Sequence, residues 1–128
     1  FLSDLRTRGQ EFNGFNLLVG DESGIYYYGN RAKNEQCYKK PQPLSWGIYG
    51  LSNGLLDSPW FKVERGKEML RLLCQRDAKE QSSTVEAFHA ELVNILYDRT
   101  QPTSDEELPC TGLDLPSERY LSSIFIPQ

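Results

Sequence analysis

The chain has 128 residues, and its 14 lysine and arginine residues against 18 aspartate and glutamate residues give a net charge of −4. The basic residues are scattered rather than gathered on one stripe, which argues against a nucleic-acid partner. No run approaches the roughly 18 apolar residues of a membrane-spanning helix, so we expect no transmembrane segment. Hydrophobic residues make up 38% of the chain, a low share for a self-sufficient core, and we expect partner strands from elsewhere to complete it.

The N-terminal part predicts the end of a helix followed by a β-hairpin. Residues 2–6 are typical of the end of a helix. An apolar run at 15–19, a turn sequence at 21–24 and a β-branched and aromatic run at 25–28 predict the hairpin. Because side chains alternate along a strand, the three consecutive tyrosines of the second run cannot share one face. We expect at least one in the core and one at an edge or pocket.

The central part predicts a loop, a strand and a helix. Polar residues and two prolines favour a loop over residues 29–43, and the apolar pattern then predicts a strand over about 44–51. Asp57 and Ser58 stand before Pro59, a combination that favours a helix start. The helical stripe that follows consists of Met69, Leu70, Leu73 and Cys74.

The C-terminal part predicts a second helix and a final strand. Ser82, Ser83 and Thr84 precede Glu86 in a sequence close to a capping box, and a helical apolar repeat follows over 85–96. Residues 100–107 are polar and predict an exposed connection, and residues 121–126 predict a strand. Strand pairs, two adjacent helices and a further strand favour the α+β class.

The metal-binding and redox residues are few. Cys37, Cys74 and Cys110 form no CxxC pair, so neither a disulfide framework nor a metal site is predicted, and a reducing compartment is the simpler inference. His89 lies alone within the second helical pattern, where a structural role is the simpler interpretation. We expect no cofactor.

Three blocks of sequence carry a family resemblance. They are residues 13–17, the glycine- and aromatic-rich run 45–67, and residues 121–126. In this order they resemble the NRDE family. The residues that match its motifs are Asn13, Gly14, Phe15, Asn16, Gly50, Leu51, Pro59, Trp60, Gly66, Lys67, Ser122 and Ser123.

Other family features are not in this chain. Family members begin with Met-Cys, carry an Asn-Arg-Asp-Glu motif soon after, and continue into a Thr-Arg-Ser-Ser stretch. We therefore interpret residues 1–128 as the central fragment of a single NRDE-family domain, whose partners are the missing N- and C-terminal parts of that domain.

The resemblance also implies a fold and a chemistry. It places the family near the N-terminal-nucleophile hydrolases, so this chain would be part of an incomplete αββα sandwich. In those enzymes the α-amino group of a terminal residue activates its own side chain as the nucleophile. Phe1 cannot play this role, and we expect the fragment to be inactive with no catalytic residue of its own.

A polar pair, Ser52 and Asn53, follows the predicted strand, where side chains can face a cleft. The setting of Asn53 is similar to an Asn of choloylglycine-type acylases, which implies that its amide donates to an oxyanion. A turn-forming role is the alternative.

A second polar pair, Asn30 and Arg31, follows the tyrosine-rich strand and matches a recurrent Asn-Arg pair of the family. An arginine there could clamp a carboxylate or phosphate with two parallel hydrogen bonds. A solvated surface turn is the alternative.

Two functions follow from the resemblance. One is a non-catalytic protein of the secretory pathway, acting in Golgi organisation and protein secretion through a small-molecule, lipid or haem ligand. The alternative is an amidase-like N-terminal-nucleophile hydrolase in the full-length parent. The implied locations are the cytoplasm in association with the Golgi, or the mitochondrion.

Overall fold

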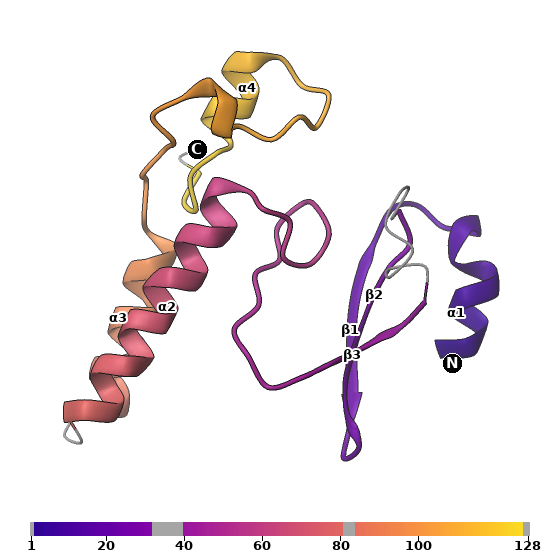
Figure 1. Cartoon of the computed structure of the whole chain (residues 1–128), viewed down its shortest axis with the longest axis horizontal. Coiled ribbons are helices and arrows are strands. Elements are labelled where there is room, and N and C mark those ends of the chain that lie inside the picture. The colour runs from indigo at the N-terminus through magenta and orange to yellow at the C-terminus, as the bar shows by residue number, and fades with distance from the viewer. Residues whose placement is uncertain (1, 32–39, 81–83, 127–128) are drawn as a thin grey trace. The chain divides into compact units, whose positions relative to one another are not determined.

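The computed structural model describes residues 2–31, 40–80 and 84–126, which belong to two compact units. Unit 1 comprises Phe1–Gly47 and Leu51–Leu56, and unit 2 comprises Ile48–Gly50 and Asp57–Gln128. Helices are combined with a small antiparallel sheet (Figure 1), which confirms the predicted α+β class. The αββα sandwich of a complete domain stays a prediction.

Unit 1 is built on a three-stranded antiparallel sheet. Strand β1 (Asn16–Asp21) pairs with β2 (Gly24–Gly29), and β2 pairs with β3 (Gln42–Leu44). The predicted hairpin is therefore confirmed. Its turn is stabilised by the Asp21 carboxylate, which accepts a hydrogen bond from the Ser23 backbone N–H at 2.8 Å, and Gly24 provides a positive φ of 146°.

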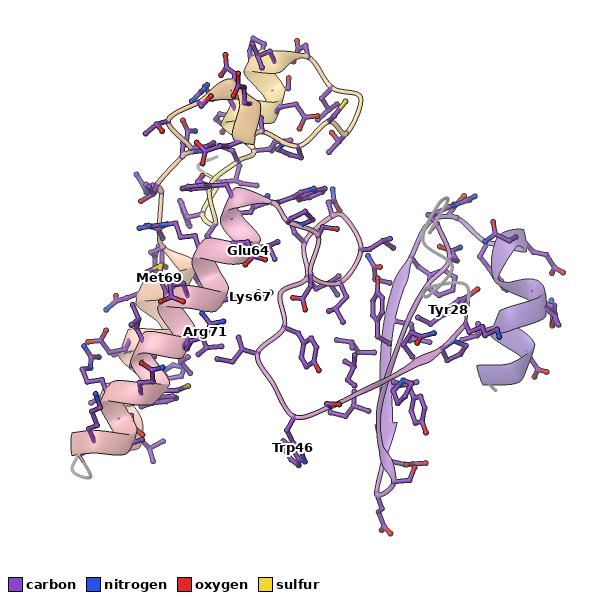
Figure 2. The ribbon with its side chains drawn as sticks, in the orientation of Figure 1. Tyr28, Trp46, Glu64, Lys67, Met69 and Arg71 are labelled. Atoms are coloured by element: carbon purple, nitrogen blue, oxygen red, sulfur yellow. The ribbon has the colours of Figure 1, made fainter. Side chains whose placement is uncertain are left out.

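The tyrosines of β2 bury side chains on both faces of the sheet. Tyr27 is 0% exposed and Tyr28 is 3% exposed, and they point to opposite faces because side chains alternate. The N-terminal helix α1 (Leu2–Arg8) and the 3₁₀ helix η1 (Gly9–Glu11) lie against the Tyr28 face, where the Tyr28 hydroxyl donates to the Leu5 carbonyl at 3.0 Å (Figures 1 and 2). A Cβ on Gly9 would lie 2.2 Å from that hydroxyl, so the contact requires glycine.

The strand predicted over residues 44–51 is wrong except at Leu44. Pro43 lies within β3, opposite Tyr26, although proline predicted a loop there. β3 is at the end of the described sheet, where a missing N–H costs no hydrogen bond. The chain bends after Leu44, and Trp46 projects fully exposed from the ribbon (Figure 2).

Unit 2 is built on two helices that lie side by side, α2 (Phe61–Glu80) and α3 (Val85–Leu96) (Figure 1). Both predicted helices are confirmed. The Thr84 side chain caps α3 by accepting from the Ala87 N–H at 3.2 Å, whereas residues 82 and 83 of the predicted cap lie outside the described residues. Leu73 is buried, as the apolar stripe of α2 predicts. Cys74 is exposed, so the buried stripe of this helix is narrower than predicted.

The start of α2 differs from the prediction. The Trp60 carbonyl accepts from the Val63 N–H at 2.9 Å and the Glu64 N–H at 3.0 Å, so the helix begins at Phe61 rather than at Pro59. Asp57 does not cap it. Its carboxylate instead accepts from the Gly50 N–H at 2.9 Å.

Asp98 joins three parts of unit 2. Its carboxylate accepts two hydrogen bonds from Arg65 of α2, from Nε at 2.5 Å and from Nη2 at 2.9 Å. The same carboxylate accepts from the Thr100 hydroxyl at 2.8 Å. The Asp98 carbonyl accepts from the Phe125 N–H at 2.8 Å. Asp98, two residues after the end of α3, thus holds α2 and the C-terminal segment in place.

The predicted strand over 121–126 is wrong. The C-terminal part contains η3 (Asp105–Glu107) and α4 (Leu115–Tyr120), followed by turns. The Ser122 hydroxyl donates to the Arg119 carbonyl at 2.6 Å, and the Ser123 hydroxyl donates to the Phe125 carbonyl at 2.7 Å. Such local bonds give the backbone an alternative to strand pairing.

Asp98 predicts an acid-dependent loss of stability. Hydrogen bonds from Arg65 hold the pKa of Asp98 below its usual value of about 3.9. The ion pair therefore stabilises the fold above that value, and its contribution is lost as the pH falls through the lower folded-state pKa. Urea unfolding should show the wild-type free energy falling more steeply below about pH 4 than that of Asp98→Asn.

The matched control is Asp77→Asn on α2, since Asp77 has no ion-pair partner within the described part of the chain. This variant should keep the wild-type acid profile. Parallel profiles for wild type and Asp98→Asn would contradict the assignment.

Candidate functional site

A concave pocket of about 350 Å³ lies in unit 1, beside the start of β1 and the end of β2. Its volume falls in the range of small-molecule sites, about 300–1,000 Å³. It is lined by Gly14, Phe15, Asn16, Arg31, Asn53, Gly54 and Leu55. We call it the Arg31–Asn53 pocket.

One wall of this pocket is fixed to the sheet by a buried hydroxyl. The Tyr27 hydroxyl donates to the Asn16 side-chain oxygen at 2.5 Å and accepts from the Leu56 N–H at 3.0 Å. The Asn16 amide nitrogen in turn donates to the Gly54 carbonyl at 2.9 Å. Residues 51–56, which contain neither helix nor strand, are thereby held on the Tyr27 face. A Cβ on Gly29 would lie 2.8 Å from Leu55, so glycine permits this approach.

Arg31 also lines the pocket and is exposed. Its Nη2 donates to the Phe12 carbonyl at 3.0 Å, which orients the planar guanidinium group. A Cβ on Gly14 would lie 3.1 Å from the Arg31 Cγ, so the small residue lets this side chain cross the loop.

Asn53 is an exposed polar side chain of the pocket lining, and its amide forms no hydrogen bond with the residues that the structure describes. The structure thus places Asn53 and Arg31, which are distant in sequence, in one pocket. Ser52 is half-buried and does not line it. The oxyanion role of Asn53 stays a prediction.

Asn30 is 2% exposed and does not line the pocket. Its amide nitrogen donates to the carbonyls of Gly9 at 2.8 Å and Asn13 at 2.9 Å, and its side-chain oxygen accepts from the Phe15 N–H at 2.7 Å. Because both sides of the amide are occupied, Asn30 holds the loop beneath the pocket rather than offering a donor to a ligand.

The family-motif residues of unit 2 stabilise its loops and helix contacts. A Cβ on Gly50 would lie 2.6 Å from Val63, so the chain passes close to α2 there. Lys67 pairs with the Asp57 carboxylate at 3.0 Å, and this hydrogen bond raises the pKa of Lys67. A Cβ on Gly66 would lie 3.5 Å from the Ile124 Cδ1, an ordinary van der Waals contact, so the approach of Ile124 to α2 does not require glycine.

The remaining motif residues divide by exposure. Leu51 and Pro59 are exposed, Trp60 is half-buried at the start of α2, and Ser122 and Ser123 are buried with their hydroxyls bonded locally.

Residues with metal-binding or nucleophilic side chains lie elsewhere. His89, Cys74 and Cys110 are exposed and do not line the Arg31–Asn53 pocket, and Cys37 lies outside the described residues. The described residues contain no group of three His, Cys, Asp or Glu side chains that could hold a metal ion. Over residues 2–31, 40–80 and 84–126, no helix has the length and apolar character needed to cross a membrane.

The pocket residues define what the site can do chemically. A guanidinium group and an amide can donate hydrogen bonds to oxygen atoms, and Phe15 and Leu55 offer apolar contact. The described lining residues include no Ser, Thr, Cys, Lys, His or carboxylate that could act as a nucleophile or general base. Fold and pocket together define an α+β protein with a pocket suited to binding a small molecule.

The chain belongs to the Transport and Golgi organisation 2 family, whose model matches residues 1–128. This is the NRDE family that the sequence resembles, so the predicted family is confirmed. Similar proteins include the mouse Transport and Golgi organization 2 homolog, 30% identical over 131 aligned positions that cover 97% of this chain and 42% of the mouse protein. The bovine Transport and Golgi organization protein 2 homolog is 32% identical, with the same coverage. Its human counterpart is 32% identical over 88% of this chain and 40% of its own length. The chain therefore spans about two fifths of these relatives.

The contrast between Asn30 and Asn53 predicts different effects of the same substitution. Asn30→Ala should lower the free energy of unfolding by about 1–3 kcal/mol, because buried backbone groups lose their partner. Asn53→Ala should change it by less than about 0.5 kcal/mol, because that amide is exposed and forms no described hydrogen bond. Chemical denaturation of both variants measures the difference, and equal losses would contradict these placements.

Proposed function

We propose that this chain supplies the ligand-binding part of a non-catalytic protein of the secretory pathway that acts in Golgi organisation and protein secretion. Membership of the Transport and Golgi organisation 2 family supports the role in Golgi organisation, as do the names of the mouse and bovine relatives. The same names support an association with the Golgi. We further propose a cytoplasmic location, with the mitochondrion as the alternative.

The observation that carries the binding function is the composition of the Arg31–Asn53 pocket. The Arg31 guanidinium and the Asn53 amide both keep N–H groups that have no described acceptor. The described lining of the pocket has no nucleophile. Donors of this kind hold a ligand in place, whereas transforming it would require a reactive group.

The pocket favours a small or lipid-like ligand over haem. Phe15 and Leu55 offer apolar contact to a ligand body. Haem iron is ordinarily held by His, Cys, Met or Tyr, and the described pocket lining contains none of these residues. Lipid handling is therefore the better supported of the two ligand roles.

One observation favours the alternative function, an amidase-like N-terminal-nucleophile hydrolase in the full-length protein. The unoccupied Asn53 amide faces a pocket of substrate size and could donate to a developing oxyanion. The nucleophile would have to come from outside the described pocket lining.

The test is complementation in cells that lack the full-length protein. Wild type and Arg8→Gln should restore Golgi morphology and reporter secretion, since Arg8 is an exposed arginine of unit 1 that does not line the pocket. The double variant Arg31→Gln/Asn53→Ala should fail to restore them at equal expression. Full rescue by the double variant, or a normal Golgi in the deleted cells, would contradict the proposal.

The same purified proteins separate the two functions. The binding protein should show no amide hydrolysis. Hydrolysis by the full-length protein that falls about 10²–10³-fold in Asn53→Ala would establish the hydrolase instead.

A further inference from the structure

We infer that the Arg31–Asn53 pocket selects ligands that carry an anionic oxygen group, a carboxylate or a phosphate, on a small apolar body. This inference rests on the proposed ligand-binding function and specifies its ligand. It follows from the charge of the pocket, the donors among its lining residues and the apolar residues that line it with them.

Arg31 differs from the other arginines whose side chains the structure describes. Each of the others has a carboxylate or aromatic partner. Arg8 pairs with Glu11 at 3.2 Å, Arg65 with Asp98 at 2.5 Å, Arg76 with Glu91 at 3.5 Å, Arg71 with Glu68 and Arg119 with Asp105, while Arg99 lies 4.8 Å from the Phe125 ring centroid. The only described partner of the Arg31 side chain is the neutral Phe12 carbonyl. Its positive charge is therefore uncompensated within the described part of unit 1.

The way Arg31 is held leaves part of the guanidinium available. One nitrogen, Nη2, is used by the Phe12 carbonyl, and the remaining N–H groups of this fork have no described acceptor. An arginine oriented in this way loses less conformational freedom when it binds an anion. Hydrogen bonds from a charged donor to an anionic acceptor are roughly twice as strong as neutral ones.

Asn53 adds a neutral donor to the lining of the same pocket. The amides of Asn16 and Asn30 are used within the protein, whereas that of Asn53 forms no described hydrogen bond. Its NH₂ group and the Arg31 fork line one pocket whose described lining contains no carboxylate. An anion there gains two kinds of donor without repulsion from the lining, although the chain as a whole carries a net charge of −4.

The apolar part of the ligand would contact Phe15 and Leu55. The Phe15 ring is held between Phe12 and Tyr28, with ring centroids 6.4 Å and 5.8 Å away. A side chain fixed in this way offers a preformed apolar surface beside the donors. The volume of about 350 Å³ admits a head group or a short chain rather than a large body.

The experiment is an NMR titration of the 128-residue chain that follows the backbone amides of Gly14 and Gly54. The probes are sodium hexanoate, its neutral isostere hexanamide, and inorganic phosphate. Hexanoate should shift both amides and bind at least about tenfold more tightly than hexanamide, because only the carboxylate pairs with the guanidinium.

Variants assign the preference to the pocket. Arg31→Gln should weaken hexanoate binding at least about tenfold, and Arg31→Lys should give an intermediate loss because it keeps the charge without the fork. Arg8→Gln makes the same charge change outside the pocket and should bind as wild type does. Because Arg31 is exposed, its variants should keep the wild-type spectrum elsewhere.

Vesicles of phosphatidylcholine, with and without phosphatidic acid, separate two sources of the anion. If free hexanoate or phosphate binds and the binding depends on Arg31, the ligand is a soluble anion. If only the phosphatidic acid vesicles bind and that binding depends on Arg31, the ligand is a lipid headgroup. Both outcomes support the inference. Equal affinity for hexanoate and hexanamide would overturn it while leaving a ligand-binding pocket. If hexanoate, phosphate and both kinds of vesicle all leave the amides unshifted, the inference is also overturned. Complementation by the double variant would then decide the proposed function separately.

Discussion

The candidate site depends on a single buried hydroxyl. Tyr27 is fully buried and its hydroxyl is bonded on both sides, to the Asn16 side chain and to the Leu56 N–H. Burying an irregular segment such as residues 51–56 against a sheet leaves backbone groups that must find partners, because an unpaired buried N–H is costly. The tyrosine supplies that partner, and the pocket wall that carries Asn53 exists because it does so.

The polar residues near the pocket fall into two groups according to whether their hydrogen-bonding groups are used. Asn16 and Asn30 are used within the protein and set the shape of the loops. Asn53 and most of the Arg31 guanidinium are left for a ligand within the described residues. In a preorganised binding site, the supporting side chains form hydrogen bonds within the protein, and the side chains above them keep donors for the ligand. The two groups of residues follow this arrangement.

The elements with strong local signals could be predicted from the sequence. The hairpin follows from two alternating runs around a turn, and the helix over 85–96 follows from its apolar repeat and the Thr84 cap. The strand predicted at 121–126 is wrong because Ser122 and Ser123 bond locally, and the one at 44–51 is wrong because strands need a pairing partner that only the tertiary fold reveals. Likewise, Asn53 and Arg31 could be named individually, but the tyrosine run did not indicate that Tyr27 would hold the segment that carries Asn53.

The measurement that tests this account most directly is the hydrogen-exchange rate of the Leu56 backbone amide, followed by NMR in the wild-type chain. Leu56 lies in neither a helix nor a strand, and its N–H donates to the Tyr27 hydroxyl at 3.0 Å, so we expect this bond to slow exchange there. We predict exchange at least about a hundredfold slower than in an unstructured chain, with this protection lost in Tyr27→Phe while the β1–β2 amides stay protected. Exchange of the wild-type Leu56 amide at the unstructured rate would show that the pocket wall is not held on the sheet.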